Sequence, residues 1–326
     1  MKAIVYTKYG PPSVLQIKEI EKPIPEDNEV LIKIRAAEAT KADCELRSFN
    51  FAVKWFWLPS RVAMGVTKPK KQVLGGYFAG EVDAVGKDVL KFKKGDQVFG
   101  TTRLLFGAYG EYVCLPANYT IVTKPHNMSF EEAAAAPLGG LNALHFMKKA
   151  NIRNREKVLI NGAGGSIGTF AVQIAKAMGA EVTAVDSSIK QEMLLRIGAD
   201  HFFDYTKEDF TKSGQTYDVI FNMVARSSYS KCVNSLNPKG RYLLGNPRIS
   251  DMLRSVFTSK FTDKTAIFAF AGEKVEELIA IKDMIEAGKI KSIVDKIYSP
   301  EQAAEAHRRV ETEQRLGIVV ISMGRS

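Results

Sequence analysis

The groups best suited to chemistry lie between Val158 and Asp186. A short apolar strand at 158–161 leads into the glycine turn 162–168, which reads Gly-Ala-Gly-Gly-Ser-Ile-Gly. Glycines permit positive φ and let backbone amides come close to an anion, because no Cβ stands in the way. The N-terminus of the helix that follows would face a pyrophosphate with its dipole and its N–H groups. The turn is therefore predicted to bind a dinucleotide.

An acid closes this unit. A second strand, 181–185, ends at Asp186, where a carboxylate can accept hydrogen bonds from the adenosine ribose. A strand, glycine turn, helix, strand and acid in this order indicate a dinucleotide-binding half-unit, whereas a glycine pattern alone also occurs in ordinary βα turns. Asp186 favours NAD(H), while Ser187, Ser188 and Lys190 are residue types that hold a 2′-phosphate. We favour NADH and leave NADPH open.

The overall composition is that of a globular protein long enough for two domains. The chain has 326 residues, of which 45% are hydrophobic and 25% charged. Because no apolar run is long enough to span a membrane and the start reads as a strand, we expect neither a membrane span nor a signal peptide. A cytoplasmic location is predicted.

Cysteine usage and net charge exclude two further classes. Cys44, Cys114 and Cys232 form no C-x-x-C pair, so we expect reduced thiols and neither a disulfide framework nor a clustered structural metal site. The net charge of +10 is compatible with a nucleic-acid partner. However, the lysines and arginines are spread along the chain and suit an anionic dinucleotide, so no nucleic-acid partner is expected.

The order of predicted elements indicates two domains. Residues 1–125 contain short strands separated by Gly and Pro, which is typical of a small barrel. From 126 to 270 strands alternate with helices, which implies a parallel sheet whose last strand, 266–270, lies at an edge. Within this part, 137–140 is predicted to interrupt a helix. The tail 271–326 has no glycine turn, so we assign it to the first domain.

One aromatic segment, 49–69, breaks this rhythm. It contains both tryptophans, Trp55 and Trp57, and is followed by Lys70 and Lys71. Three interpretations stay open: a packed excursion, a mobile lid over a substrate pocket, and a membrane-surface helix, since aromatics beside lysines bind interfaces. We favour the first two over the third.

Taken together, these motifs resemble the medium-chain dehydrogenase/reductase superfamily, and its zinc-free quinone oxidoreductase-like branch looks closest. The resemblance implies a Rossmann-type doubly wound parallel sheet, 126–270, inserted into a GroES-like β-barrel catalytic domain, 1–125 plus 271–326. It also implies a homodimer. The segments that carry it are the start 1–6, then 80–82, 85–86, 95–98, the glycine turn, 197–200 and 204–205.

The chain departs from zinc-dependent members of this family at their metal ligands. Where those members have a cysteine, residues 39–43 read Ala-Thr-Lys-Ala-Asp, and their Gly-His-Glu is Gly-Gly-Tyr at 75–77. Zinc needs three or four N, S or O ligands held together. The four histidines lie elsewhere in the sequence, so we expect no zinc.

Zinc-free relatives reduce quinones or the C=C bond of α,β-unsaturated carbonyls, and the resemblance implies the same here. The substrate oxygen then needs only hydrogen-bond donors, for which Thr40, Lys41 and Tyr77 are the candidates. Two alternatives stay open. One is an enoyl-thioester reductase, with Lys68, Lys70 and Lys71 serving a phosphopantetheine arm. The other is a non-enzymatic relative that binds nucleotide or RNA.

The resemblance also implies the cofactor contacts. Phe268 and Phe270 resemble a segment that lines the nicotinamide pocket and joins subunits. The complete predicted set is Asn142, Gly162, Gly164, Gly165, Ser166, Ile167, Asp186, Ser187, Lys190, Tyr205, Val224, Gly245, Phe268 and Phe270.

Overall fold

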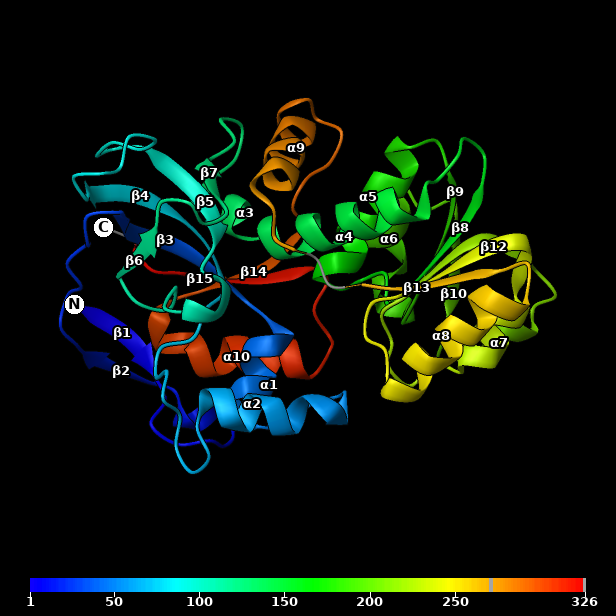
Figure 1. Cartoon of the computed structure of the whole chain (residues 1–326), viewed down its shortest axis with the longest axis horizontal. Helices are drawn as coiled ribbons and strands as arrows, with labels where there is room; N and C mark the ends of the chain where they lie inside the picture. The colour runs from blue at the N-terminus through cyan, green and yellow to red at the C-terminus, as the bar shows by residue number, and fades with distance from the viewer. Residues whose placement is uncertain (270–271, 325–326) are drawn as a thin grey trace. The chain divides into compact units, whose positions relative to one another are not determined.

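The chain divides into two compact units in the computed structural model, which describes residues 1–269 and 272–324. Unit 1 comprises residues 1–51, 56–138 and the C-terminal part from 273, and unit 2 comprises 52–55 and 139–272. Figure 1 labels their elements.

Unit 2 is built on a six-stranded parallel sheet in the order β10-β9-β8-β11-β12-β13. Residues 158–160 of β8 are fully buried, as expected for a central strand covered on both faces. Strand order reverses between β8 and β11, and such a switch point is where open α/β sheets bind ligands. The strands are β8 (Lys157–Asn161), β9 (Glu181–Asp186), β10 (His201–Asp204), β11 (Tyr217–Asn222), β12 (Leu236–Leu244) and β13 (Thr265–Phe268).

The predicted helix interruption at 137–140 is wrong. The break comes earlier, after α3 (Phe130–Ala134), and Pro137 begins α4 (Pro137–Ala150). Proline suits the first turn of a helix, because its missing N–H would have no intrahelical partner there. Helix α3 belongs to unit 1, and α4 lies almost wholly in unit 2. The other helices of unit 2 are α5 (Ser166–Ala177), α6 (Gln191–Arg196), α7 (Tyr229–Asn234) and α8 (Ile249–Phe261), with the short η4 (Ser188–Lys190) and η5 (Phe210–Lys212).

Unit 1 contains a mainly antiparallel seven-stranded sheet in the order β14-β15-β3-β4-β5-β7, and β6 also pairs with β3. The long β3 (Glu29–Ala39) is central, and β15 pairs with it, so the C-terminal strands belong to this sheet. The other strands are β4 (Tyr77–Val85), β5 (Gln97–Thr101), β6 (Tyr112–Pro116), β7 (Ile121–Thr123), β14 (Val294–Tyr298) and β15 (Ile318–Ser322), with the separate pair β1 (Lys2–Val5) and β2 (Gln16–Glu19).

The remaining helices of unit 1 include α1 (Lys41–Ser48), which follows directly after β3 and carries several candidate residues. The others are α2 (Trp57–Met64), α9 (Val275–Glu286) and α10 (Ala303–Glu311), with the short η1 (Pro12–Val14), η3 (Arg103–Leu105) and η6 (Pro300–Gln302). The short η2 (Lys54–Phe56) spans a boundary, because residues 52–55 belong to unit 2. Across residues 1–269 and 272–324, no helix is both long and apolar enough to cross a bilayer.

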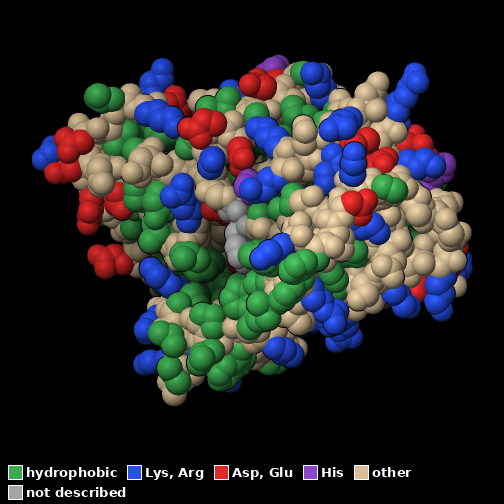
Figure 2. Space-filling view, turned by 45° about the vertical axis from the view of Figure 1, so that its right-hand side comes forward, with side chains coloured by type: hydrophobic (Ala, Val, Ile, Leu, Met, Phe, Trp, Pro, Cys, Tyr) green, Lys and Arg blue, Asp and Glu red, His purple; other side chains and the backbone are tan. Residues whose placement is uncertain are grey.

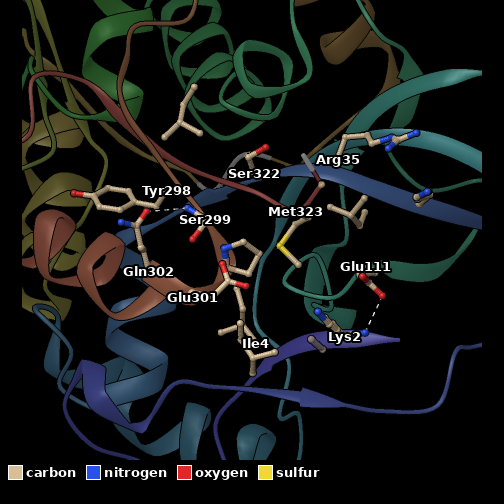
Figure 3. A pocket seen from close by; sticks show the side chains of 17 residues that line it. Lys2, Ile4, Arg35, Glu111, Tyr298, Ser299, Glu301, Gln302, Ser322 and Met323 are labelled. Carbon is tan, nitrogen blue, oxygen red and sulfur yellow. Dashed lines mark hydrogen bonds between the residues drawn. The ribbon is translucent and has the colours of Figure 1, made fainter. Parts of the chain in front are cut away.

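Unit 1 also contains a cavity of about 510 Å³ beside β1 and the C-terminal strands. Figure 3 shows its lining, which includes Ile4, Arg35, Glu111, Tyr298 and Met323. The described lining residues include none of the three catalytic candidates, so we do not assign the cavity to the site below.

Candidate functional site

The turn after β8 is shaped by two glycines. Gly162 has φ of 91°, a conformation that side-chain-bearing residues rarely adopt. A Cβ on Gly168 would lie 2.4 Å from the carbonyl oxygen of Gly162, so only glycine lets α5 start this close to the strand. The N-cap of α5 is Gly165, which has no side chain to cap the helix. Backbone N–H groups of the first turn thus lack intrahelical acceptors, as an anion site requires.

Asp186 sits beside this turn and forms a buried ion pair. The Lys190 ammonium lies 3.0 Å from Asp186 Oδ1, and the two side chains are 4% and 9% exposed. The N–H of Gly164 donates to Asp186 Oδ2 at 2.8 Å, and the N–H of Ser187 donates to Oδ1 at 2.9 Å. A carboxylate offers about four acceptor positions. With Lys190 and a long contact from the Ser187 hydroxyl at 3.5 Å, four groups already face the carboxylate, so a ribose hydroxyl would have to replace one of them.

Several other predicted cofactor residues lie at the carboxyl edge of the same sheet. Val224 follows β11, and its Cγ2 is 3.4 Å from the position of a Cβ on Gly162. Tyr205 follows β10 and donates its N–H to the Asp186 carbonyl at 3.2 Å. Gly245 directly follows β12, and Phe268 ends the neighbouring strand β13. The structure thus brings these residues of unit 2 to one edge, which supports their assignment.

The remaining members of the predicted set lie on helices or outside the described residues. Ser166 and Ile167 begin α5. Asn142 lies on α4, which approaches α5 closely, since a Cβ on Gly139 would lie 2.4 Å from the Ser166 carbonyl oxygen. Phe270 lies outside the described residues.

A buried amide network at this edge was missed at the level of sequence. Asn161 at the end of β8 donates to Asn222 Oδ1 at 2.9 Å and to Ser227 Oγ at 2.8 Å. Asn222 at the end of β11 donates to the Tyr242 hydroxyl at 2.9 Å and accepts from the Val224 N–H at 3.1 Å. The network ties the two central strands together where the turn leaves the sheet. In the sequence, the signal for this network is an asparagine at the end of each apolar run.

In unit 1, Thr40 caps the helix that follows β3. Its hydroxyl oxygen accepts the Asp43 N–H at 3.0 Å, and the same hydroxyl donates to Asp43 Oδ2, with 2.6 Å between the two oxygens. Asp43 Oδ2 also accepts from the Thr40 N–H at 3.1 Å, which completes a capping box. Thr40 is only 2% exposed. Its hydroxyl proton is therefore already engaged inside the protein.

Asp43 also binds the segment 75–77, which carries the candidate Tyr77. Its Oδ1 accepts the N–H of Gly75 at 3.1 Å, and the Tyr109 hydroxyl donates to Oδ2 at 3.4 Å. Burial raises the pKa of the Asp43 carboxyl, while the bonds from Thr40 and Gly75 oppose that shift. One buried carboxyl thus fixes the end of β3 and the start of β4 with respect to each other.

Tyr77 and Lys41 each have an acidic partner. The Tyr77 hydroxyl donates to Glu273 Oε1 at 3.0 Å, and Thr101 donates to Oε2 of the same carboxylate at 2.9 Å. Burial and then the Glu273 charge raise the pKa of Tyr77. Lys41 is exposed and pairs with Glu313 at 2.6 Å. Of the three catalytic candidates, Thr40 and Tyr77 are linked through the segments that Asp43 joins, and Lys41 lies on the surface.

His307 occupies the buried side of this network. Its Nε2 is 3.1 Å from the Tyr109 hydroxyl, and its Nδ1 accepts from Arg47 Nε at 3.3 Å. Arg47 is fully buried and also pairs with Glu311. Burial, assisted by the Arg47 charge, lowers the pKa of His307 to about 3. The imidazole is thus neutral in the folded protein at ordinary pH.

Stability is expected to decrease in mild acid because of this histidine. Between a pKa of about 6.5 in the unfolded chain and about 3 in the folded one, the unfolded state binds an extra proton. The free energy of unfolding should therefore fall by about 1.4 kcal/mol per pH unit below pH 6.5 from this group. Urea titrations of the protein and of His307→Gln measure it. The variant should show a shallower slope, and an unchanged slope would contradict the assignment. The titration of Asp43 contributes to the slope of both the unsubstituted protein and the variant.

The residues at the family's metal positions do not fit zinc. The Thr40 hydroxyl is used by Asp43, position 76 is a glycine, and the Tyr77 hydroxyl is used by Glu273. Within the part of the chain that the structure describes, no three His, Cys, Asp or Glu side chains come together as a metal site. The donor chemistry that zinc requires is thus not offered at these positions.

A glycine turn at the switch point of a parallel sheet, combined with a barrel-like second unit, defines a nucleotide-dependent oxidoreductase of the alcohol dehydrogenase type. The family model "Alcohol dehydrogenase GroES-like domain" matches residues 26–126, and "Zinc-binding dehydrogenase" matches 197–321. Quinone oxidoreductase of Sus scrofa is 31% identical over 95% of this chain and 94% of its own length. The chain belongs to the medium-chain dehydrogenase/reductase superfamily, in its quinone oxidoreductase-like branch.

Two further relatives agree with this membership. 2-Methylene-furan-3-one reductase of Solanum lycopersicum is 30% identical over 98% of this chain and 79% of its own. The solved structure of the quinone oxidoreductase from Coxiella burnetii has a TM-score of 0.88 at 27% identity and covers 99% of both chains. The predicted fold class is confirmed: a Rossmann-type parallel sheet together with a GroES-like domain. The prediction of a pyridine-nucleotide-dependent oxidoreductase is confirmed as well.

Proposed function

We propose that this protein transfers a hydride from NAD(P)H to a quinone or to the C=C bond of an α,β-unsaturated carbonyl, without zinc. NAD(P)H supplies the hydride when bound. The observation that carries the proposal is the side-chain chemistry at the metal positions, where Thr40 and Tyr77 offer hydroxyls and Gly76 offers nothing. The names of the pig and tomato relatives support this substrate class.

The chain's own residues would bind, orient and supply donors. The first-turn amides of α5 would hold the pyrophosphate, and Asp186 would accept from the adenosine ribose. Negative charge that develops on a substrate oxygen is stabilised by donors placed in advance. Tyr77 is our first candidate for this role; its hydroxyl proton is donated to Glu273 at 3.0 Å, so Tyr77 would have to exchange this bond for one to the substrate oxygen. Thr40 and Lys41 remain proposed donors. Because its ion pair with Glu313 is exposed, Lys41 can leave its partner most easily.

Tyr77→Phe is expected to lower kcat/KM on the order of tenfold, because one hydroxyl donor is lost while the ring is kept. The measurement is steady-state reduction of a quinone and of an enone. Tyr112→Phe, which removes another part-exposed tyrosine hydroxyl of unit 1, is the matched control and should leave kcat/KM unchanged. Equal rates for Tyr77→Phe and the unsubstituted protein would remove Tyr77 from the proposed site.

One assay separates the candidate functions. The loss of reduced-nicotinamide absorbance is followed with NADH or NADPH against a quinone, an enone and a crotonyl thioester. We expect turnover with the first two acceptors. Preferential turnover of the thioester would favour the enoyl-thioester alternative. If all three are inert while RNA binds with a steep salt dependence, the proposed reaction is wrong and the binding alternative holds.

Further assignments accompany this proposal. We propose that unit 2 is the dinucleotide-binding domain and that unit 1 is the catalytic domain. The predicted bounds are 126–270 and 1–125 plus 271–326, whereas residues 126–138 belong to unit 1 and 52–55 to unit 2. We also propose that NADH is preferred and that the protein is cytoplasmic. All three cysteines are free thiols, in keeping with that location. We also propose a homodimer. The edge strand β13 and exposed apolar side chains of α8, among them Leu253 and Phe257, support it.

A further inference from the structure

Helix α2 presents an apolar face to solvent. Leu58 is 65% exposed and Val62 is 66% exposed, and residues four apart share one face of a helix. Val66, just past the helix end, is 69% exposed, and Trp57 at its start is 46% exposed. Leu58 and Val62 thus share the outer face, while Trp57, whose ring centroid also lies 6.5 Å from that of Phe49, and Val66 flank them along the chain, so four exposed apolar side chains fall on one short segment.

The opposite side of α2 is held firmly. Met64 is buried in a cluster with Phe49, Phe51 and Phe106. The Arg61 guanidinium stacks over the Phe49 ring at 3.9 Å from its centroid. The Tyr9 hydroxyl lies 2.8 Å from the Gly65 carbonyl oxygen and 3.1 Å from that of Met64. The exposure of the outer face is therefore a property of an anchored helix.

Positive charge surrounds this face. No Asp or Glu occurs between Glu45 and Glu81, and Lys68, Lys70 and Lys71 are all exposed. Lys70 donates to the Val62 carbonyl oxygen at 3.4 Å, so this lysine folds back beside the apolar face. Figure 2 shows hydrophobic side chains gathered low on the molecule, at the height at which Figure 1 shows α2, with Lys and Arg at their border.

We propose that this face, made by Trp57, Leu58, Val62 and Val66 with Lys68, Lys70 and Lys71 at its border, docks onto an anionic lipid surface. Apolar side chains of such a helix enter the interface while neighbouring lysines attract acidic headgroups. A second copy of the same face would bring the lysines of both copies together, which is unfavourable. Nucleic acid would use the lysines but leave the apolar side chains exposed. Lipid satisfies both features, and this inference is independent of the proposed reaction.

The test is co-sedimentation of the full chain with phosphatidylcholine vesicles, with and without phosphatidylglycerol. We expect binding to the phosphatidylglycerol vesicles that weakens as salt is added, and little binding to phosphatidylcholine alone. In a Trp55→Phe variant, Trp57 is the one remaining tryptophan. Its fluorescence should be quenched by brominated acyl chains when the vesicles are anionic. Unquenched fluorescence in a sedimented complex would mean that another surface binds, which overturns the proposal.

Two sets of variants separate the apolar and the basic parts. Each lysine near an anionic surface strengthens binding about fivefold, so Lys68→Gln, Lys70→Gln and Lys71→Gln together should weaken it about 100-fold. Leu58→Ser with Val62→Ser should weaken it at least about tenfold. The matched controls change exposed residues elsewhere in unit 1, with leucines even more exposed than Leu58 and Val62: Lys87→Gln, Lys93→Gln and Lys94→Gln together, and Leu90→Ser with Leu104→Ser.

Neither control should weaken binding more than about twofold. The proposal is overturned if the controls weaken vesicle binding as much as the α2 variants do. It is also overturned if the protein does not bind anionic vesicles. This includes the outcome in which the same lysines bind RNA instead. Circular dichroism in vesicle-free buffer verifies that each variant is folded.

Discussion

Asp43→Ala is expected to lose about 3–5 kcal/mol of unfolding free energy and about 100-fold in kcat/KM. The carboxyl accepts four hydrogen bonds, of which those from the Thr40 and Gly75 N–H groups are backbone bonds in the interior. Without it, both N–H groups lose their acceptor in a place where water cannot replace it. The end of β3 and the start of β4, which carry Thr40 and Tyr77, would no longer be fixed to each other.

Chemical denaturation and steady-state kinetics, measured below the variant's melting range, check the two effects separately. Asp251→Ala is the matched control. Asp251 is also a buried aspartate in a helix capping box, at the start of α8 in unit 2. It should cost about 1 kcal/mol and leave kcat/KM unchanged. Asp43→Asn, which keeps an acceptor oxygen, should fall between the two. An Asp43→Ala protein with full activity would show that Thr40 and Tyr77 need no such anchor.

Local sequence signals predicted the nucleotide-binding unit well. Strand β8, the glycine turn, α5 and β9 with Asp186 at its end lie consecutively in the chain, so each boundary carries its own signal: apolar run, glycine or acid. Strand β7 was not predicted, because three residues, Ile121–Thr123, are too few to show a period. The Pro137 error has the same origin: proline marks either a helix break or a first turn, and the sequence offered no means to choose.

The environment of the catalytic candidates depends on long-range contacts and could not be read from spacing. Thr40 and Asp43 form a local capping pattern, T-x-x-D, that was available but not used. By contrast, Glu273 reaches Tyr77 and His307 reaches Tyr109 from distant parts of the chain. Only folding brings such partners together. Residue type alone predicts that Tyr77 can donate, but not that a carboxylate already accepts its proton.

Lys190 shows the same limit within unit 2. Its type and position suggested a phosphate ligand, and its distance from Asp186 in sequence suggested nothing about burial. In the structure it is 3% exposed and lies against the Asp186 carboxylate. Its charge thus reduces the repulsion that Asp186 alone would exert on a 2′-phosphate. We therefore expect the balance between the two cofactors to depend on this pair rather than on Asp186 alone.

Replacing Asp186 by serine is expected to shift the kcat/KM ratio from NADH toward NADPH by about 100-fold. The NADH reaction should weaken about tenfold, because a charged acceptor for the ribose is lost. The NADPH reaction should improve about tenfold, because the carboxylate no longer repels the 2′-phosphate and the Lys190 ammonium, previously 3.0 Å from Asp186, becomes available to it. Kinetics with both cofactors and calorimetric titration of each check the shift.

Two further variants show whether the pair itself decides the preference. Asp204→Ser is the matched control, since Asp204 is a buried aspartate at the end of β10, directly opposite Asp186 in the strand register. It should leave the ratio unchanged. Lys190→Met should disfavour NADPH further and cost about 3 kcal/mol of stability, because Asp186 loses its buried counter-ion. If Asp186→Ser and Asp204→Ser give the same ratio, the edge of the sheet at β9 does not hold the adenosine ribose. The cofactor would then have to be placed elsewhere on unit 2.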